Sequence, residues 1–167
     1  GASKLAGEGY CSAYKHSFDI DTVALRFGNV YGPGSLHKGS VVAKFIKQAL
    51  NGERLEIYGN GAQTRDFIFI DDLIEAILKA GKINGIGGQI FQIATNKETT
   101  VLEITEKLLE VLQKKQITNI KFYNGNNRLG DVKRNFSDTS KAKKMLGWES
   151  KTSLSVGLEK TVNYFIN

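Results

Sequence analysis

The sequence predicts an α/β fold, in which strands and helices alternate along the chain. Residues 21–32 and 89–95 are runs of apolar, β-branched and aromatic side chains. Such runs predict strands buried on both faces, as in parallel sheets. Other stretches carry apolar residues at helical spacing, most regularly at residues 40–52, 71–81 and 100–115. This alternation is typical of an α/β domain.

The first predicted helix covers residues 3–17. Its apolar positions keep helical spacing at Leu5, Ala6, Tyr10, Ala13 and Tyr14. The strand that follows stops at "GPG". The helix at residues 40–52 ends at Gly52, which we expect to cap its C-terminus. A short strand at 55–59 then leads into a glycine-rich turn at 59–64.

The remaining elements continue the alternation. In order, they are a strand at 65–70, a helix at 71–81, a strand at 89–95, a helix at 100–115, a strand at 119–124, and helices within 137–148 and 153–166. Asp71 is predicted as an N-cap, and Asp71 and Asp72 together complement the helix dipole. Thr100 and Glu103 have the spacing of a capping box. Gly147 closes the short helix before it.

Size and composition indicate one ordinary globular domain. The chain has 167 residues, of which 41% are hydrophobic and 24% charged, and a chain of this size typically buries about 70% of its unfolded surface. No apolar run approaches the length of a membrane span, and no signal-peptide pattern is seen. The single cysteine, Cys11, fits a cytoplasmic protein, and we expect it to be a small core residue.

The formal net charge of +6 raises the possibility of a nucleic-acid partner. The densest basic stretches are "VKR" and "SKAKK", and neither is interleaved with aromatic residues that could stack on bases. An anionic small ligand is therefore the favoured interpretation of the charge.

Lys4 raises the question of a partner side chain. A lysine four residues after a tyrosine on one helix shares a face with it, yet none of the six tyrosines has a lysine four residues later. Two interpretations remain open. Lys4 is an ordinary surface lysine, or the residue before Gly1 belonged to an active site from which this chain has been separated.

Four stretches, in this order, resemble one enzyme family. They are "GASK" at the start, "LRFGNVYGPG" from Leu25, "IYGNGAQTRDFIFIDD" from Ile57, and "NRLGD" followed by "FSDTSKAKKMLGW" between Asn127 and Trp148. Together they are similar to the C-terminal half of the extended short-chain dehydrogenases/reductases. The specific resemblance is to the NAD-dependent epimerase/dehydratase family, of the UDP-glucose 4-epimerase type, which works on nucleotide sugars. The family's N-terminal half and its glycine-rich loop are absent.

The resemblance implies the fold in more detail. It would be the C-terminal part of an NAD(P)-binding, Rossmann-like fold together with a small substrate-binding α/β subdomain. Residues 1–35 and about 66–96 would belong to the Rossmann-like part, and residues about 36–65 and 97–167 to the part that binds the nucleotide sugar. The implied partners are a nucleotide-diphosphate sugar and the missing N-terminal half of the enzyme, with no membrane.

Three residues are implied at the cofactor, NAD. Lys4 matches the family's catalytic lysine, whose charge lowers the pKa of a neighbouring phenol and which also hydrogen-bonds the nicotinamide ribose. Phe27 and Gly28 would lie along the nicotinamide, at the carboxyl end of a parallel strand. His16 and His37 have no partners at metal-ligand spacing, so no metal site is predicted.

Three residues are implied at the diphosphate of the nucleotide sugar: Asn29, Arg65 and Arg128. A planar guanidinium can bind a diphosphate through two parallel hydrogen bonds, which a lysine cannot do. Structural roles are the alternatives. Asn29 would then serve a turn, and Arg65 would pair at the surface with the adjacent Asp66.

Further residues are implied at the nucleoside. The backbone of Glu56, Ile57 and Tyr58 would lie against the base. Asp131, three residues after Arg128, would accept hydrogen bonds from the nucleoside hydroxyls. The alternative is that Arg128 and Asp131 form a structural pair within their loop.

The implied parent reaction is the NAD-mediated oxidation of the sugar to a keto intermediate, followed by epimerisation or dehydration, with 4-epimerisation as the first choice. The chain alone is expected to be inactive, because it has neither the phenol base nor the pyrophosphate loop. A non-catalytic nucleotide-sugar-binding or regulatory module is the alternative, and a basic nucleic-acid-binding domain is a remote one. Strand edges without their neighbours lead us to expect self-association or a homodimer.

Overall fold

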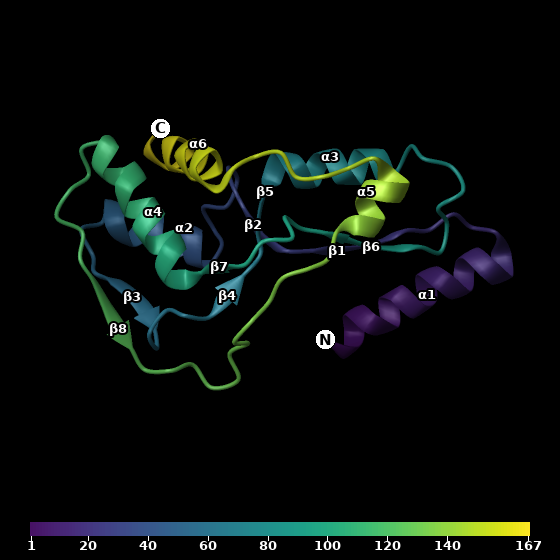
Figure 1. Cartoon of the computed structure of the whole chain (residues 1–167), viewed down its shortest axis with the longest axis horizontal. Helices are drawn as coiled ribbons and strands as arrows, with labels where there is room; N and C mark the ends of the chain where they lie inside the picture. Colours follow the sequence, from purple (N-terminus) through teal and green to yellow (C-terminus); the bar gives the residue numbers. More distant parts are fainter.

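The computed structural model describes all 167 residues and shows an elongated α/β arrangement with two groups of elements (Figure 1). The helices are α1 (Ala2–Phe18), α2 (Val41–Leu50), α3 (Ile70–Ala80), α4 (Val101–Lys114), α5 (Ser140–Leu146) and α6 (Leu154–Ile166). The strands are β1 (Ala24–Phe27), β2 (Asn29–Tyr31), β3 (Leu55–Tyr58), β4 (Thr64–Arg65), β5 (Phe67–Phe69), β6 (Ile90–Ile93), β7 (Thr99–Thr100) and β8 (Phe122–Gly125). The predicted α/β character is confirmed, and none of the six helices combines the length and apolar character that crossing a membrane requires.

The first group of elements is built around the parallel pair β1 and β6. In Figure 1, α1 lies on one side of this pair, and α3 and α5 lie on the other. Trp148, just after α5, is buried in a cluster with Leu73 of α3 and Phe91 of β6. Its ring N–H donates a hydrogen bond to the backbone carbonyl of Asp72 at 2.9 Å, which satisfies the buried indole. The segment after α5 is thereby fixed against α3.

The second group of elements is built around the parallel pair β3 and β8, covered by α2, α4 and α6. The apolar side chains of α2 recur at helical spacing and are buried at Val42, Phe45, Ile46 and Ala49. They join a core cluster to which α4 and α6 also contribute, so the amphipathic pattern of α2 is satisfied by tertiary packing. The assignment of residue ranges to a cofactor part and a sugar part stays a prediction.

Two short strand pairs join the two groups: β2 runs parallel to β5, and β4 runs antiparallel to β7. Between β4 and β5 lies Asp66, which is only 1% exposed. Its carboxylate accepts hydrogen bonds from the N–H and hydroxyl of Thr95 at 2.7 and 2.6 Å, and from the N–H groups of Asn96 and Ser137 at 3.0 and 3.4 Å. One carboxylate therefore joins β4 and β5 to the segment after β6 and to the segment before α5.

The strand predicted at residues 21–32 is two strands, because the chain changes its partner at Gly28. The Gly28 N–H donates to the Ile93 carbonyl of β6 at 3.0 Å, whereas the Asn29 N–H donates to the Asp66 carbonyl at 2.6 Å. The prediction that this strand is buried on both faces is wrong for β1. Phe27 is 49% exposed, since β6 is the only strand that pairs with β1.

Helix ends follow the local sequence signals in part. The Thr100 side chain caps α4, and Gly147 ends α5 in a left-handed conformation, both as predicted. The prediction of Asp71 as an N-cap is wrong, because α3 begins at Ile70 and has Phe69 as its N-cap. The buried Asp72 accepts hydrogen bonds from the segment that leads into α6, which the dipole interpretation did not anticipate.

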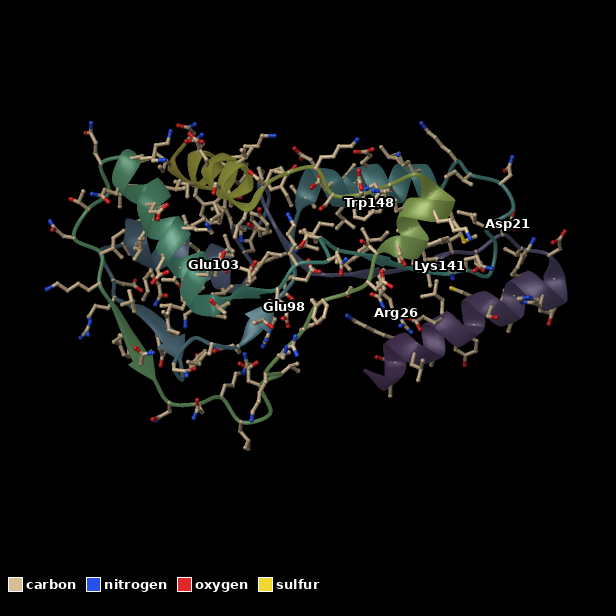
Figure 2. The ribbon with its side chains drawn as sticks, in the orientation of Figure 1. Asp21, Arg26, Glu98, Glu103, Lys141 and Trp148 are labelled. Carbon is tan, nitrogen blue, oxygen red and sulfur yellow. The ribbon has the colours of Figure 1, made fainter.

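Helix α1 lies beside β1, and none of its residues is buried. The prediction of an apolar face at Leu5, Ala6, Tyr10, Ala13 and Tyr14 is not matched by burial, because all five side chains are exposed. Cys11 is half-buried rather than a core residue. The contact with β1 includes an ion pair in which Arg26 donates two hydrogen bonds to Glu8, at 2.7 and 2.6 Å; Figure 2 labels Arg26 beside α1.

Candidate functional site

Two adjoining cavities lie where the predicted site residues meet. The larger, of about 930 Å³, lies between α1, β1 and the start of α2. The smaller, of about 220 Å³, lies between α2, β3, β4 and the loop at residues 126–136. Asn29, Ser40 and Val41 line both, so the cavities adjoin at the start of α2. Of the predicted site residues, all except Ile57 line one cavity or the other.

The larger cavity brings together Lys4, Phe27 and Gly28. Lys4 lies in the first turn of α1, while Phe27 and Gly28 lie at the carboxyl end of β1, where α/β sheets place their ligands. No strand covers this edge of β1, so the cavity reaches the strand. Gly28 also has a packing role, because a Cβ at this position would lie 2.8 Å from the Asp66 carbonyl oxygen.

Tyr31 is the one tyrosine that lines the same cavity as Lys4. Its ring is buried and its hydroxyl donates a hydrogen bond to the Leu154 carbonyl at 3.5 Å. Burial raises the pKa of the Tyr31 hydroxyl well above its usual value, and the nearby Asp72 carboxylate adds to the effect. Tyr31 is therefore a neutral core residue and is unsuited to act as a base.

Charged side chains of both signs line the smaller cavity. The cations are Lys44, Arg65 and Arg128, and the anions are Glu56 and Asp131. Arg128 takes part in none of the ion pairs of the structure. The smaller cavity therefore has one cation free of a carboxylate partner and two that are paired.

The N-terminus of α2 lies at the smaller cavity and adds partial positive charge to it. Ser40 is the N-cap of this ten-residue helix, and Val41 is its first residue. The first backbone N–H groups of a helix have no partner within it and carry the positive end of its dipole. The Ser40 hydroxyl oxygen is buried without a hydrogen-bond partner. A helix start and unpaired donors beside guanidinium groups favour the binding of an anion.

The surrounding loop and strand hold Arg65 in place. Its Nη1 donates to the carbonyls of Thr64 and Val132 at 2.7 and 2.6 Å, and its Nη2 donates to the Asp131 carboxylate. The alternative that Arg65 pairs with Asp66 is wrong, because the Asp66 carboxylate is buried and bonded to other segments. The Arg65 Nε takes part in none of these hydrogen bonds.

The strand β3 presents two of the predicted nucleoside residues to the cavity. Lys44 lies with its Nζ 3.7 Å from the Glu56 carboxylate and 5.3 Å from the centre of the Tyr58 ring. The Glu56 side chain extends along the sheet to Gly125 of β8, where an added Cβ would lie 2.6 Å from its Oε1. The Ile57 side chain points the opposite way, into the core, because side chains alternate along a strand.

Sequence reasoning missed three polar side chains of the smaller cavity. Ser40 and Lys44 lie one turn apart at the start of α2, and Gln63 donates to the Tyr58 carbonyl at 3.0 Å. The only signal was the N-cap position of Ser40, since a lysine on an amphipathic helix is indistinguishable from a surface residue. No group of three or more His, Cys, Asp or Glu side chains is placed to hold a metal ion.

Residues 1–94 match the model of the NAD dependent epimerase/dehydratase family. Among curated relatives, a UDP-glucose 4-epimerase of Mycolicibacterium smegmatis is 36% identical over 99% of this chain and 52% of its own length. A UDP-glucuronate 4-epimerase of Thermodesulfobacterium geofontis is 33% identical over 98% of this chain and 49% of its own length. The chain thus spans about half the length of these relatives.

Solved structures show the same partial coverage. A UDP-glucose 4-epimerase of Thermotoga maritima, solved with UDP-glucose, superposes with a TM-score of 0.92 at 34% identity, over 99% of this chain and 52% of that one. A UDP-glucuronic acid 4-epimerase of Bacillus cereus, solved with UDP-glucuronic acid and NAD, superposes with a TM-score of 0.85 at 32% identity, over 99% and 51%. The arrangement of elements described above is therefore that of about half of such an enzyme.

Proposed function

Because this chain belongs to the NAD dependent epimerase/dehydratase family, we propose that it is the C-terminal, substrate-binding portion of a nucleotide-sugar epimerase or dehydratase. The observation that carries the proposal is the convergence of Arg65, Arg128 and the start of α2 on one cavity. The names of the relatives, which include UDP-glucose and UDP-glucuronate 4-epimerases, favour 4-epimerisation as the reaction of the whole enzyme.

The diphosphate would lie in the smaller cavity, between Arg65, Arg128 and the first N–H groups of α2. The Nε of Arg65 has no hydrogen-bond partner, and Arg128 has no carboxylate partner. Two guanidinium groups and a helix start supply enough donors for an anion with two phosphates. Asn29 lines both cavities, so its amide would contact the ligand where it passes from one cavity to the other.

The nucleoside would lie at the outer end of the smaller cavity, against β3. The exposed Tyr58 ring and the backbone around Ile57 would face the base, while Glu56 and Asp131 would accept hydrogen bonds from N–H or hydroxyl groups. Both carboxylates are already held by cations, Glu56 by Lys44 and Asp131 by Arg65. Each carboxylate would therefore accept hydrogen bonds from the nucleoside and from its cation at the same time.

The residues of the larger cavity fit the nicotinamide end of NAD, since Lys4, Phe27 and Gly28 surround an open strand end. When bound, NAD would supply the acceptor for a hydride from a ring carbon of the sugar. The Lys4 ammonium would hold the ribose hydroxyls and keep a nearby phenol deprotonated, so that the phenolate takes the proton of the sugar hydroxyl. The sugar would then be a keto intermediate, ready for epimerisation or dehydration.

The 167-residue chain by itself would bind a nucleotide sugar without converting it. Lys4 has no phenol to activate, since Tyr31 is buried with a raised pKa and donates to the Leu154 carbonyl. A polypeptide that supplies the phenol would complete the site, and the open edge of β1 is where it would join the sheet. The same edge would support self-association of the isolated chain.

Calorimetric titration of the chain with UDP, UDP-glucose and uridine tests this proposal. We expect UDP and UDP-glucose to bind at least about tenfold more tightly than uridine, because charge-assisted bonds to the diphosphate supply most of the affinity. Replacement Arg128→Ala should remove most of that difference. Equal binding of uridine and UDP, or no binding of UDP, would overturn the site. Conversion of UDP-glucose by the chain with added NAD would overturn the expectation of inactivity.

A further inference from the structure

The loop at residues 126–136 carries two residues of the smaller cavity, Arg128 and Asp131, but contains no helix or strand. It runs beside β4, where the Lys133 carbonyl accepts the Thr64 N–H at 2.9 Å. With no regular hydrogen bonding of its own, the loop depends on contacts with neighbouring strands for its position.

One such contact uses Arg65, a residue that we propose for the diphosphate. Arg65 donates to the Asp131 carboxylate and to the Val132 carbonyl, and so holds the middle of the loop. The same guanidinium faces the smaller cavity. A ligand that draws Arg65 toward itself therefore competes with this contact.

A second contact lies outside the cavity and involves Glu98, just before β7. Arg134, at the far end of the loop, donates its Nε and Nη2 to the two carboxylate oxygens of Glu98 at 2.9 and 2.8 Å. The Thr64 hydroxyl donates to the same carboxylate at 3.0 Å. Figure 2 labels Glu98 beside β4. One carboxylate thus joins the loop, β4 and the segment before β7.

The Glu98–Arg134 ion pair lies at the surface, away from the hydrophobic core. The Arg134 side chain is 70% exposed, and an ion pair with so exposed a partner contributes little to global stability. The bidentate geometry, however, fixes both distance and direction between the loop and β7. Its effect is therefore local to the loop.

We propose that Glu98 is a positioning residue of the site, which holds the loop through Arg134 so that Arg128 faces the cavity before a ligand arrives. This inference rests on the proposed nucleotide-sugar site. A loop ordered in advance loses less conformational entropy when the ligand binds. Because Glu98 lines neither cavity nor the neighbouring hollow beside Arg128 and Arg134, it keeps the loop in place when Arg65 turns toward the diphosphate.

Substitution Glu98→Gln tests the proposal, with UDP as the probe and calorimetry as the measurement. We expect UDP to bind about fivefold more weakly, the size of effect that an exposed bidentate pair can transmit. Amide hydrogen exchange of residues 127–136 should become faster, while the unfolding temperature changes no more than in the control. The control is Glu149→Gln, which removes another ion pair, with Lys143 at 2.6 Å, from residues that line neither cavity.

Arg134→Gln and the double variant Glu98→Gln/Arg134→Gln complete a cycle. If the two residues act as one unit, each single variant and the double variant should weaken UDP binding to the same extent. Additive losses would overturn the proposal, since they would mean that Arg134 acts on the ligand directly.

The remaining outcomes separate this inference from the proposed function. If the unmodified chain binds UDP and Glu98→Gln binds it equally well, the positioning role is wrong and the site stands. If UDP binding weakens but exchange in residues 127–136 is unchanged, the positioning role is also wrong. If the unmodified chain does not bind UDP, the proposed site fails, and this inference fails with it.

Discussion

Arg65 on β4 and Asp131 in the loop at residues 126–136, 66 residues apart in the sequence, form an ion pair in the smaller cavity. Both side chains are mostly buried, and Arg65 also donates to the Val132 carbonyl of the same loop. The pair orients the guanidinium and fixes the loop at the same time. One contact therefore places two of the residues that we propose for the diphosphate and the nucleoside.

Replacement of Arg65 by lysine should weaken UDP binding about tenfold or more, although the charge is kept. A lysine supplies no planar fork, so it can form neither the hydrogen bonds that hold Asp131 and Val132 nor a bidentate contact with a phosphate. Calorimetry with UDP measures the effect. Arg54→Lys is the matched control, because Arg54 lies over the Tyr123 ring and lines neither cavity. Equal losses in the two variants would contradict the assigned role.

Replacement of Asp66 by asparagine should lower the free energy of unfolding by about 2–4 kcal/mol, measured by urea denaturation. The carboxylate accepts hydrogen bonds from Thr95, Asn96 and Ser137, and an amide N–H₂ would face some of these donors with a donor of its own. The exposed Asp71, replaced in the same way, should change stability by less than about 1 kcal/mol. Similar losses at both positions would mean that Asp66 is not the junction described.

Replacement of Gly28 by alanine should destabilise the chain by about 1–3 kcal/mol, because the added Cβ would meet the Asp66 carbonyl oxygen at 2.8 Å and that backbone cannot move aside. Gly39→Ala is the control, since a Cβ there meets nothing within 4 Å. Thermal unfolding of both variants distinguishes a packing requirement from a general effect of removing glycine. Unchanged stability of Gly28→Ala would show that the strands are free to separate at this point.

Attachment of α1 to β1 should depend on pH through Glu8. The hydrogen bonds from Arg26 lower the pKa of the Glu8 carboxyl below its ordinary value of 4.5. A carboxyl whose pKa is lower in the folded state contributes its full stabilisation above the unfolded pKa and loses it as the pH falls through the folded one. Amide exchange in α1 should therefore be constant from pH 7 to 5 once corrected for its intrinsic pH dependence, and should accelerate below 4.5.

The Glu8→Gln variant provides the comparison for this measurement. Its exchange in α1 should already be fast at neutral pH and should show no further change in the acid range. An acid-induced change of equal size in the variant would assign the effect to another carboxyl group.

The sequence by itself determined the local features of the fold, which depend on residues close together in the chain. Thr100 and Gly147 cap their helices as predicted, because each acts on backbone groups within a few residues. The apolar spacing of α2 and α4 predicted their buried faces for the same reason. The resemblance in four stretches pointed to the residues that line the two cavities, and Ile57 is the exception because its side chain lies on the other face of β3.

The tertiary structure alone decided which distant groups each polar side chain meets. The partners of Asp66 lie 29 to 71 residues away, and Glu98 meets Arg134 across 36 residues. No spacing rule carries that information, since a carboxylate takes its role from whichever donors the fold brings within about 3 Å. The burial of β1 was also decided by the tertiary structure. Its apolar run predicted a core strand, but β1 pairs with β6 alone, and Phe27 is half-exposed.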